Sequence, residues 1–327
     1  MSAVKVALVG ASGETGQSIV NGLLGSQDTK FDIVALTRPE SLEKPANTNL
    51  KERGVKIVPA DLRGPQDEIV KLLSGIDIVI SAIYFGSLAD EVLLANAAKI
   101  AGVKRFVQSA FMIILPPRGV VDFREQKENN LGHIQSLHLP YTYIDVGWWY
   151  QLTLPRLPSG RIDYALPKTQ DNQVIGLDGN IPSALADIRD VGRYVARIIT
   201  DPRTLNKKVH VYNEIYTRNQ VYEVLERHSG EKIPREYISE NEVNTRIEEA
   251  RTALNKNHKD GDALSTFTVS QLFRSWGIRG ENTPEYAAYL GYLNGKDLYP
   301  DFEFTKFEDY VKEVLEGKVK GVYQTKK

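Results

Sequence analysis

The chain has 327 residues, a formal net charge of −1 at pH 7 and no cysteine. This balance gives no electrostatic reason to expect a nucleic acid or an anionic membrane as partner, and the lack of cysteine excludes disulfides, thiolate nucleophiles and cysteine metal sites. The opening residues, MSAVKVALVG, do not form a signal peptide, and no run approaches the roughly 18 apolar residues needed to cross a bilayer, so we expect a cytoplasmic protein.

Six short apolar runs in the first half of the chain are predicted to be strands. Each is apolar throughout rather than alternating, which is typical of parallel strands covered on both faces. Helical patterns separate them, for example at 15–25 and 89–102. Such β-α-β units predict an α/β fold with a doubly wound, Rossmann-type sheet, whose ligand lies beyond the carboxyl ends of the strands. The predicted strands are 4–10, 31–38, 55–61, 76–83, 103–109 and 140–147.

The sequence changes character after about residue 150. It becomes loop-rich, and then 187–202 has the pattern of a helix capped by Asp187 or Asp190. A strongly polar stretch from 248 predicts a surface helix that runs into a loop. We therefore expect a dinucleotide-binding domain at 1–150 and a smaller α/β substrate domain at 151–327, with some interleaving of the two.

The glycine-rich segment GASGETG, 10–16, directly follows the first predicted strand and opens a helix. In this context Gly10 permits a tight turn, Gly13 lets the backbone approach a pyrophosphate, and Gly16 lets helix and sheet pack closely. The N-terminus of the helix supplies free N–H groups and a partial positive charge for phosphates. Glycine-rich turns also occur without ligands, but the position at the first βα turn favours a dinucleotide site.

Arg38 ends the second predicted strand, in the segment ALTRPES. A site for NADH usually has an acidic residue here, which binds the ribose hydroxyls. A guanidinium group is instead suited to a 2′-phosphate, so Arg38 favours NADPH. The alternative is that Arg38 merely caps the strand end in solvent.

Phe123 and Lys127 occupy the positions of a Tyr-x-x-x-Lys pair, in which nicotinamide-dependent reductases use the tyrosine as proton donor. Asp122 and Glu125 have the spacing of a capping box, which predicts a helix from Asp122 to about His138. On that helix Lys127 falls inside the apolar stripe. A buried ammonium acquires a lowered pKa or a specific partner, although a lysine whose tip reaches water would fit the same pattern.

An ordered set of motifs resembles the isoflavone reductase and pinoresinol–lariciresinol reductase family, within the NmrA-like group of atypical short-chain dehydrogenases. The motifs are GASGETG, RPES, VISAI, AGVKRFVQSAF, FREQK with LPYTYI, and LYPDFEFT at 298–305. The resemblance spans nearly the whole chain. It implies an NADPH-dependent enzyme that reduces small aromatic secondary metabolites.

The resemblance also implies site residues. The family's catalytic lysine stands 14 residues before the first tyrosine of a Pro-Tyr-Thr-Tyr strand, and Lys127 has this spacing from Tyr141. In such enzymes the lysine donates the proton, or orients water and the nicotinamide ribose. The remaining cofactor residues that we expect are Ser12 and Thr15 in the glycine loop, Asp61 and Leu62 near the adenine, and Ser81, Ala82 and Ile83 after the fourth strand.

One departure affects the substrate side of the site. Family members usually have Ser-Glu-Phe-Gly after the fifth strand, whereas this chain has Ser109-Ala110-Phe111-Met112. The apolar loop that follows predicts a different pocket, so substrates of plant members do not transfer. The residues that we expect to contact the substrate are Tyr84, Phe85, Phe111, Met112, Trp148 and Trp149.

These features predict an NADPH-dependent reductase of a small, aromatic enone, carbonyl or related compound, with Lys127 as proton donor. We expect a small-molecule substrate, no metal, no nucleic-acid or membrane partner, and a monomer or homodimer. The rival hypothesis is an NmrA-like sensor that binds NADP(H) without catalysis and regulates a protein partner. A third keeps the fold and changes the reaction to imine or quinone reduction.

Overall fold

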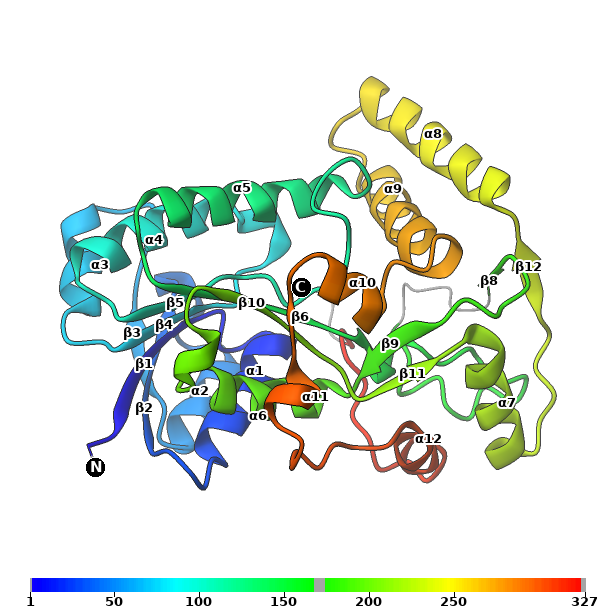
Figure 1. Cartoon of the computed structure of the whole chain (residues 1–327), viewed down its shortest axis with the longest axis horizontal. Helices are drawn as coiled ribbons and strands as arrows, with labels where there is room; N and C mark the ends of the chain where they lie inside the picture. The colour runs from blue at the N-terminus through cyan, green and yellow to red at the C-terminus, as the bar shows by residue number, and fades with distance from the viewer. Residues whose placement is uncertain (1, 168–173, 325–327) are drawn as a thin grey trace.

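A parallel sheet of eight strands forms the centre of the part that the computed structural model describes, residues 2–167 and 174–324 (Figure 1). The order is β13-β10-β6-β5-β4-β1-β2-β3, so the chain switches direction across the sheet at β1 and β4. All neighbouring pairs are parallel. The strands are β1 (Val4–Val9), β2 (Phe31–Thr37), β3 (Lys56–Pro59), β4 (Ile78–Ser81), β5 (Arg105–Val107), β6 (Tyr141–Val146), β10 (Lys207–Val211) and β13 (Leu293–Asn294).

Both faces of the sheet are buried because each strand turns apolar side chains to both sides. In β1, Val6 and Leu8 pack on the face covered by α1 and α6, and Ala7 packs on the face covered by α3, α4 and α5 (Figure 1). The predicted doubly wound α/β fold is therefore confirmed. The helices of this part are α1 (Glu14–Leu24), α2 (Pro45–Glu52), α3 (Gln66–Leu73), α4 (Asp90–Ile100), α5 (Asp122–Ser136) and α6 (Ile188–Ile198).

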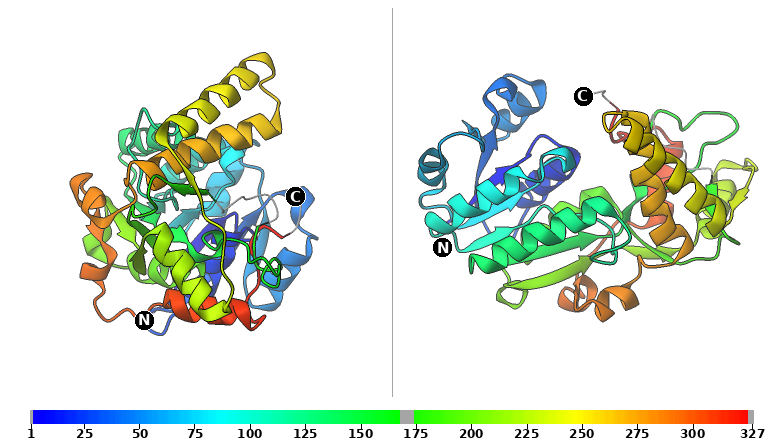
Figure 2. Two further views of the ribbon diagram at one scale, coloured as in Figure 1. Left: turned by 90° about the vertical axis from the view of Figure 1, so that its right-hand side faces the viewer. Right: turned by 90° about the horizontal axis from the view of Figure 1, so that it is seen from above.

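Most of the remaining elements build a second, smaller part beside the β6 side of the sheet. It holds one three-stranded and one two-stranded sheet, and α8 and α9 project from it side by side (Figure 2). Its elements are β7 (Trp148–Trp149), β8 (Val174–Gly176), β9 (Ser183–Ala186), β11 (Glu214–Tyr216), β12 (Glu236–Ile238), α7 (Arg218–Ser229), α8 (Glu240–Lys256), α9 (Gly261–Phe273) and α12 (Phe307–Leu315). The short helices α10 (Pro284–Tyr289) and α11 (Gly295–Leu298) instead contact the strands β10 and β13 at the edge of the main sheet. A π-helical turn, Arg274–Ile278, extends α9.

Elements from both sides of residue 150 build the main sheet. The strands β10 and β13 extend it beyond β6, and α6 packs against α1. The change in composition near residue 150 is therefore not a break in the sheet, and the predicted domain division stays a prediction. Within the described residues, no helix has both the length and the apolar composition needed to cross a membrane.

Two predicted helix starts had different outcomes. Asp187 caps α6, and its carboxylate accepts a hydrogen bond from the Arg189 N–H at 2.8 Å, as predicted. The capping box predicted at Asp122 is wrong, because α5 takes Val121 as its N-cap residue and has no side-chain cap. The Asp122 carboxylate instead accepts a hydrogen bond from Gln271 of α9, and Glu125 accepts one from the Gly119 N–H.

Close contact between α1 and α6 fixes the face of the sheet beneath the glycine loop. A Cβ atom on Gly192 of α6 would lie 1.7 Å from the carbonyl oxygen of Ser18 in α1. The Gly192 N–H also donates to the Ser18 hydroxyl at 2.9 Å. Only glycine allows the two backbones to approach this closely.

We predict that Gly192→Ala lowers the free energy of unfolding by about 2 kcal/mol, because the added methyl group forces α6 away from α1. Gly132→Ala is the matched control, since Gly132 lies within α5 with open space around its Cβ position. Alanine there should be neutral or stabilise by up to about 1 kcal/mol. Urea unfolding checks both variants, and equal midpoints for them would contradict the proposed contact.

Candidate active site

The glycine loop between β1 and α1 has the geometry of a phosphate cradle. Gly10 has a φ of 82°, and a Cβ atom there would lie 2.2 Å from the carbonyl oxygen of Ala82. A Cβ atom on Gly16 would lie 2.0 Å from the Gly10 carbonyl oxygen. Gly13 is the N-cap residue of α1, and Ser12 and Thr15 beside it are partly exposed. The loop therefore brings backbone, rather than side chains, to the first turn of α1, where N–H groups lack acceptors within the helix.

The opposite end of the cradle contains the residues predicted for the adenine side. Arg38 follows β2 with 71% of its side chain exposed, and its guanidinium lies 3.4 Å from the Glu40 carboxylate. Asp61 and Leu62 follow β3, where Asp61 is exposed and Leu62 is half-buried. An exposed pair such as Arg38 and Glu40 is weak, so the guanidinium can turn to an incoming phosphate.

The end of β4 completes the cradle and fits a bound dinucleotide. Ser81 is fully buried, and its hydroxyl has no hydrogen-bond partner among the described residues. Ala82 and Ile83 follow it, half-buried, and the Ala82 N–H donates to the Val9 carbonyl at 2.9 Å. Buried polar groups are rarely left without a partner, so this orphan hydroxyl is consistent with a ligand group at the carboxyl end of β4.

Lys127 lies on the buried face of α5 and is 4% exposed. Its ammonium donates hydrogen bonds to the carbonyl oxygens of Ser109 and Ala110, the latter at 3.1 Å. Burial lowers the pKa of Lys127 to about 8, and the negative charges of Glu91 and Asp145 oppose part of that shift. The lysine is therefore an amine held out of water at the carboxyl end of β5, with one N–H beyond the two that these carbonyls accept.

A second buried charged group, centred on Arg124, supports the same helix one turn before Lys127. The Arg124 guanidinium donates to Asp145 of β6 at 2.7 Å and to the Tyr292 hydroxyl at 2.7 Å. It also bonds Glu128 at 3.0 Å. Arg124 and Asp145 are both 1% exposed or less, so their charges neutralise each other inside the protein.

Aromatic side chains gather around the loop that follows β5. Phe123, Trp148 and Trp276, together with Met112, are partly buried against Ile113, Leu115, Val120 and Val121. The Trp148 and Trp276 rings are stacked, with centroids 5.5 Å apart. These side chains form an aromatic wall, and Phe123 connects it to α5, one helical turn before Lys127.

The structure brings together only some of the predicted substrate residues. Phe85 is 49% exposed and its ring centroid lies 6.4 Å from that of Phe123, and Tyr84 contacts Phe85. Phe111 packs instead against the core under α1 and α6, with a φ of 44°. Trp149 is 8% exposed and stacks on Tyr323, so it belongs to that core as well.

Tyr323 brings a late segment of the chain to the glycine loop. Its N–H donates to the Glu14 carboxylate at 3.1 Å, in the first turn of α1. Val322 is buried in the same core as Trp149. This contact draws the acidic Glu14 side chain toward the Tyr323 backbone.

Several residues of this region were not expected from the sequence. Glu91 looked like an ordinary acid in the first turn of a helix, yet it is fully buried. Trp276 lies in the π-helical turn, which has no recognisable periodicity. Asp145 could have been recognised from the sequence as a buried charge that needs a partner, because it is the one charged residue inside an apolar strand.

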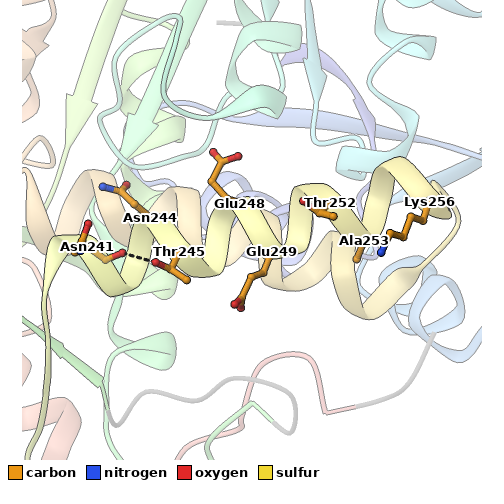
Figure 3. A pocket seen from close by; sticks show the side chains of 8 residues that line it. All are labelled: Asn241, Asn244, Thr245, Glu248, Glu249, Thr252, Ala253 and Lys256. Atoms are coloured by element: carbon orange, nitrogen blue, oxygen red, sulfur yellow. Dashed lines mark hydrogen bonds between the residues drawn. The ribbon is translucent and has the colours of Figure 1, made fainter.

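Two hollows in the surface lie away from this region. One of about 590 Å³ is lined by polar residues of a single helix, α8 (Figure 3). Another of about 340 Å³ lies beside β10 and β13. Neither hollow includes Lys127 or the glycine loop. We therefore assign the candidate site from the chemistry of the residues at the carboxyl ends of the strands. The α8 hollow is lined by Asn241, Asn244, Thr245, Glu248, Glu249, Thr252, Ala253 and Lys256.

Comparison with known proteins places the chain among oxidoreductases. A model of the NmrA-like family matches residues 2–311. Over 314 residues, 96% of each protein, the chain is 60% identical to asnovolin J 5′,6′-dehydrogenase of Aspergillus novofumigatus. It resembles the structure of an isoflavone reductase with a TM-score of 0.78 at 26% identity, covering 95% of this chain and 99% of that one. The complex of leucoanthocyanidin reductase with NADPH from Vitis vinifera has the fold in common, with a TM-score of 0.78 at 23% identity over 95% and 99% of the chains.

We predict that Arg124→Met lowers the free energy of unfolding by about 3–5 kcal/mol, because Asp145 is then buried without its cation. The loss should shrink between pH 7 and pH 5, because the isolated Asp145 has a raised pKa and takes up a proton on folding. The control is Arg63→Met, since Arg63 is 68% exposed beside Asp90 and should contribute no more than about 1 kcal/mol. Urea unfolding at the two pH values measures both, and a loss independent of pH would contradict the role given to Asp145.

Proposed function

This chain belongs to the NmrA-like family, and from that premise we propose that it is an NADP(H)-dependent oxidoreductase of a small unsaturated or aromatic molecule, with Lys127 as the proton-transferring group. The observation that carries the proposal is the buried Lys127 ammonium at the carboxyl end of β5. A pKa of about 8 lets this amine exist in both protonation states near neutral pH. The predicted resemblance to isoflavone reductases is confirmed by the family match and the structural likeness.

The residues that would hold the dinucleotide extend along the carboxyl edge of the sheet. The N–H groups at the start of α1 would bind the pyrophosphate, Arg38 would bind the 2′-phosphate, and Ser81 would supply its free hydroxyl. Asp61 and Leu62 would border the adenine, and Ala82 and Ile83 would border the other end of the cofactor. When bound, the cofactor supplies or accepts a hydride at the nicotinamide C4.

Lys127 suits either direction of the reaction. In reduction of an enone, hydride reaches the β-carbon, and the ammonium stabilises the enolate oxygen and returns a proton to the product. In oxidation, the neutral amine removes the proton next to the carbonyl as hydride leaves the β-carbon. The name of the 60% identical relative, a 5′,6′-dehydrogenase, supports testing both directions.

The aromatic wall supports a flat or extended apolar substrate. Met112, Phe123, Trp148 and Trp276 would contact its carbon skeleton, and Phe85 would close the outer side with Tyr84. Aromatic faces bind such molecules through offset or edge contacts. Phe111 and Trp149 would act behind this wall, by holding the loop and the end of β6 in place.

The rival hypothesis is a sensor that binds NADP(H) without catalysis. A sensor has no use for an amine buried near the cofactor, because burial of a charge lowers stability unless the charge is used. Cofactor that binds tightly but is never turned over with a broad panel of enones, quinones and imines, or with their saturated counterparts and NADP⁺, would favour the sensor.

We predict that Lys127→Met lowers turnover by roughly 10²-fold or more, because the proton donor is lost. NADPH affinity, measured by the quenching of protein fluorescence, should stay within about twofold. Lys99→Met is the control, because Lys99 is exposed on α4 and should leave turnover unchanged. Wild-type turnover in Lys127→Met would disprove the assigned role.

The pH dependence of the wild-type enzyme should have opposite signs in the two directions. Reduction requires the ammonium, so its rate should be constant at low pH and fall as the pH rises through about 8. Oxidation requires the neutral amine and should rise over the same range. Initial rates between pH 6 and pH 10 measure this, and two parallel profiles would count against proton transfer by Lys127.

We predict that Arg38→Ala weakens binding of NADPH by about tenfold or more and leaves binding of NADH unchanged, since only NADPH has the 2′-phosphate. Arg53→Ala is the control, because Arg53 follows α2 and bonds Asn21 rather than the cradle. Titration calorimetry with both cofactors measures the effect. Equal weakening of both would mean that Arg38 stabilises the loop rather than the phosphate.

A further inference from the structure

Glu91 is a buried acid that is connected to Lys127 through one residue, Ser109, and it lies on a different helix. It lies in the first turn of α4 and is 0% exposed. One carboxylate oxygen accepts a hydrogen bond from the Ser109 N–H at 2.6 Å, and the other accepts one from the Asn130 amide at 2.9 Å. Both oxygens of the Glu91 side chain therefore act as hydrogen-bond acceptors.

Ser109 connects this carboxylate directly to the amine. Its N–H bonds Glu91, its carbonyl oxygen accepts from Lys127, and its hydroxyl donates to the Ile83 carbonyl at 3.1 Å. Asn130 lies one turn after Lys127 on α5 and also donates to the Leu88 carbonyl at 2.9 Å. The carboxylate thus joins α4, the loop after β5 and α5, the three segments that determine where the amine lies.

Among the acidic side chains around Lys127, Glu91 differs from the others because it has no cationic partner among the described residues. Arg124 on α5 and Asp145 on β6 are paired at 2.7 Å, and Glu128 bonds both Arg124 and Lys208. Tyr143 and Tyr292 bond to this same group through their hydroxyls. Among the described residues, no lysine, arginine or histidine forms an ion pair with Glu91. No cation bonded to Glu91 neutralises its negative charge, so this charge favours the protonated form of Lys127.

We propose that Glu91 is a positioning residue for the reaction, which holds the Ser109 peptide under the Lys127 amine and sets the pH at which that amine exchanges its proton. The proposal rests on the proposed role of Lys127. Without the charge of Glu91, Asp145 would be the remaining acid that opposes the effect of burial, and the Lys127 amine would shift further toward its neutral form.

The test compares Glu91→Gln with Asp90→Asn, the same acid-to-amide change one residue earlier on α4. Asp90 pairs with Arg63 near the surface and has no bond to Ser109 or Asn130. In Glu91→Gln, the midpoint of the pH–rate profile should move down by roughly one unit, because a nearby negative charge is removed. Turnover at pH 8 should fall in reduction, and Asp90→Asn should reproduce the wild-type profile.

A direct titration separates this proposal from the proposed function. Lysines labelled with ¹³C at Cε are titrated by NMR in the NADPH-bound protein, and Lys127→Met identifies the Lys127 signal. A downward shift of that signal in Glu91→Gln supports the proposal even if no substrate is turned over. An unchanged Lys127 titration overturns it, whatever the activity.

If Glu91→Gln does not fold, Glu91→Asp replaces it. This variant keeps the charge but shortens the side chain by one methylene, so it cannot reach both Ser109 and Asn130. We expect turnover to fall at least fivefold, the NADPH affinity to stay unchanged and the Lys127 midpoint to stay near that of the wild type. Full turnover in Glu91→Asp would overturn the positioning role.

Discussion

Removal of the Lys127 amine from water is the constraint on which the candidate site depends. An ammonium in an apolar cleft is costly, and this chain offsets the cost with two backbone carbonyls and a distant carboxylate rather than with a direct ion pair. A direct ion pair would hold the proton too firmly for transfer near neutral pH. The arrangement leaves an amine whose pKa lies near 8, at the edge of the sheet where the cofactor cradle ends.

The parts of the structure that local chemistry determines could be predicted from the sequence. The six predicted strands of the first half are all present, because continuous apolar runs have few alternatives to a covered parallel strand. Helical periodicity placed Lys127 in the apolar stripe with Leu131 and Ile134, which are buried too, but it left open whether the tip of the lysine reaches water. The residues of the glycine loop lie together at one turn because their spacing in the sequence, rather than contacts with distant residues, determines the backbone conformation.

The parts that depend on partners far along the chain could not be predicted. Asp122 has the spacing of a cap, but Gln271, from α9, binds its carboxylate. Glu91 is indistinguishable in sequence from a solvated acid, and only the packing of α4 against α5 buries it. Trp276 joins Trp148 through a π-helical turn, and nothing in the sequence brings residue 276 to residue 148. The substrate wall is thus a tertiary feature, whereas the cofactor cradle is largely a local one.

The contact between Tyr323 and Glu14 has a consequence for how the protein matures on the ribosome. The glycine loop is among the first segments to be synthesised, but helix α6, which packs against α1, and the Tyr323 segment emerge far later. Nascent domains usually fold as they leave the exit tunnel. The glycine loop therefore acquires its last contacts only once the segment around Tyr323, some 300 positions downstream, has been synthesised.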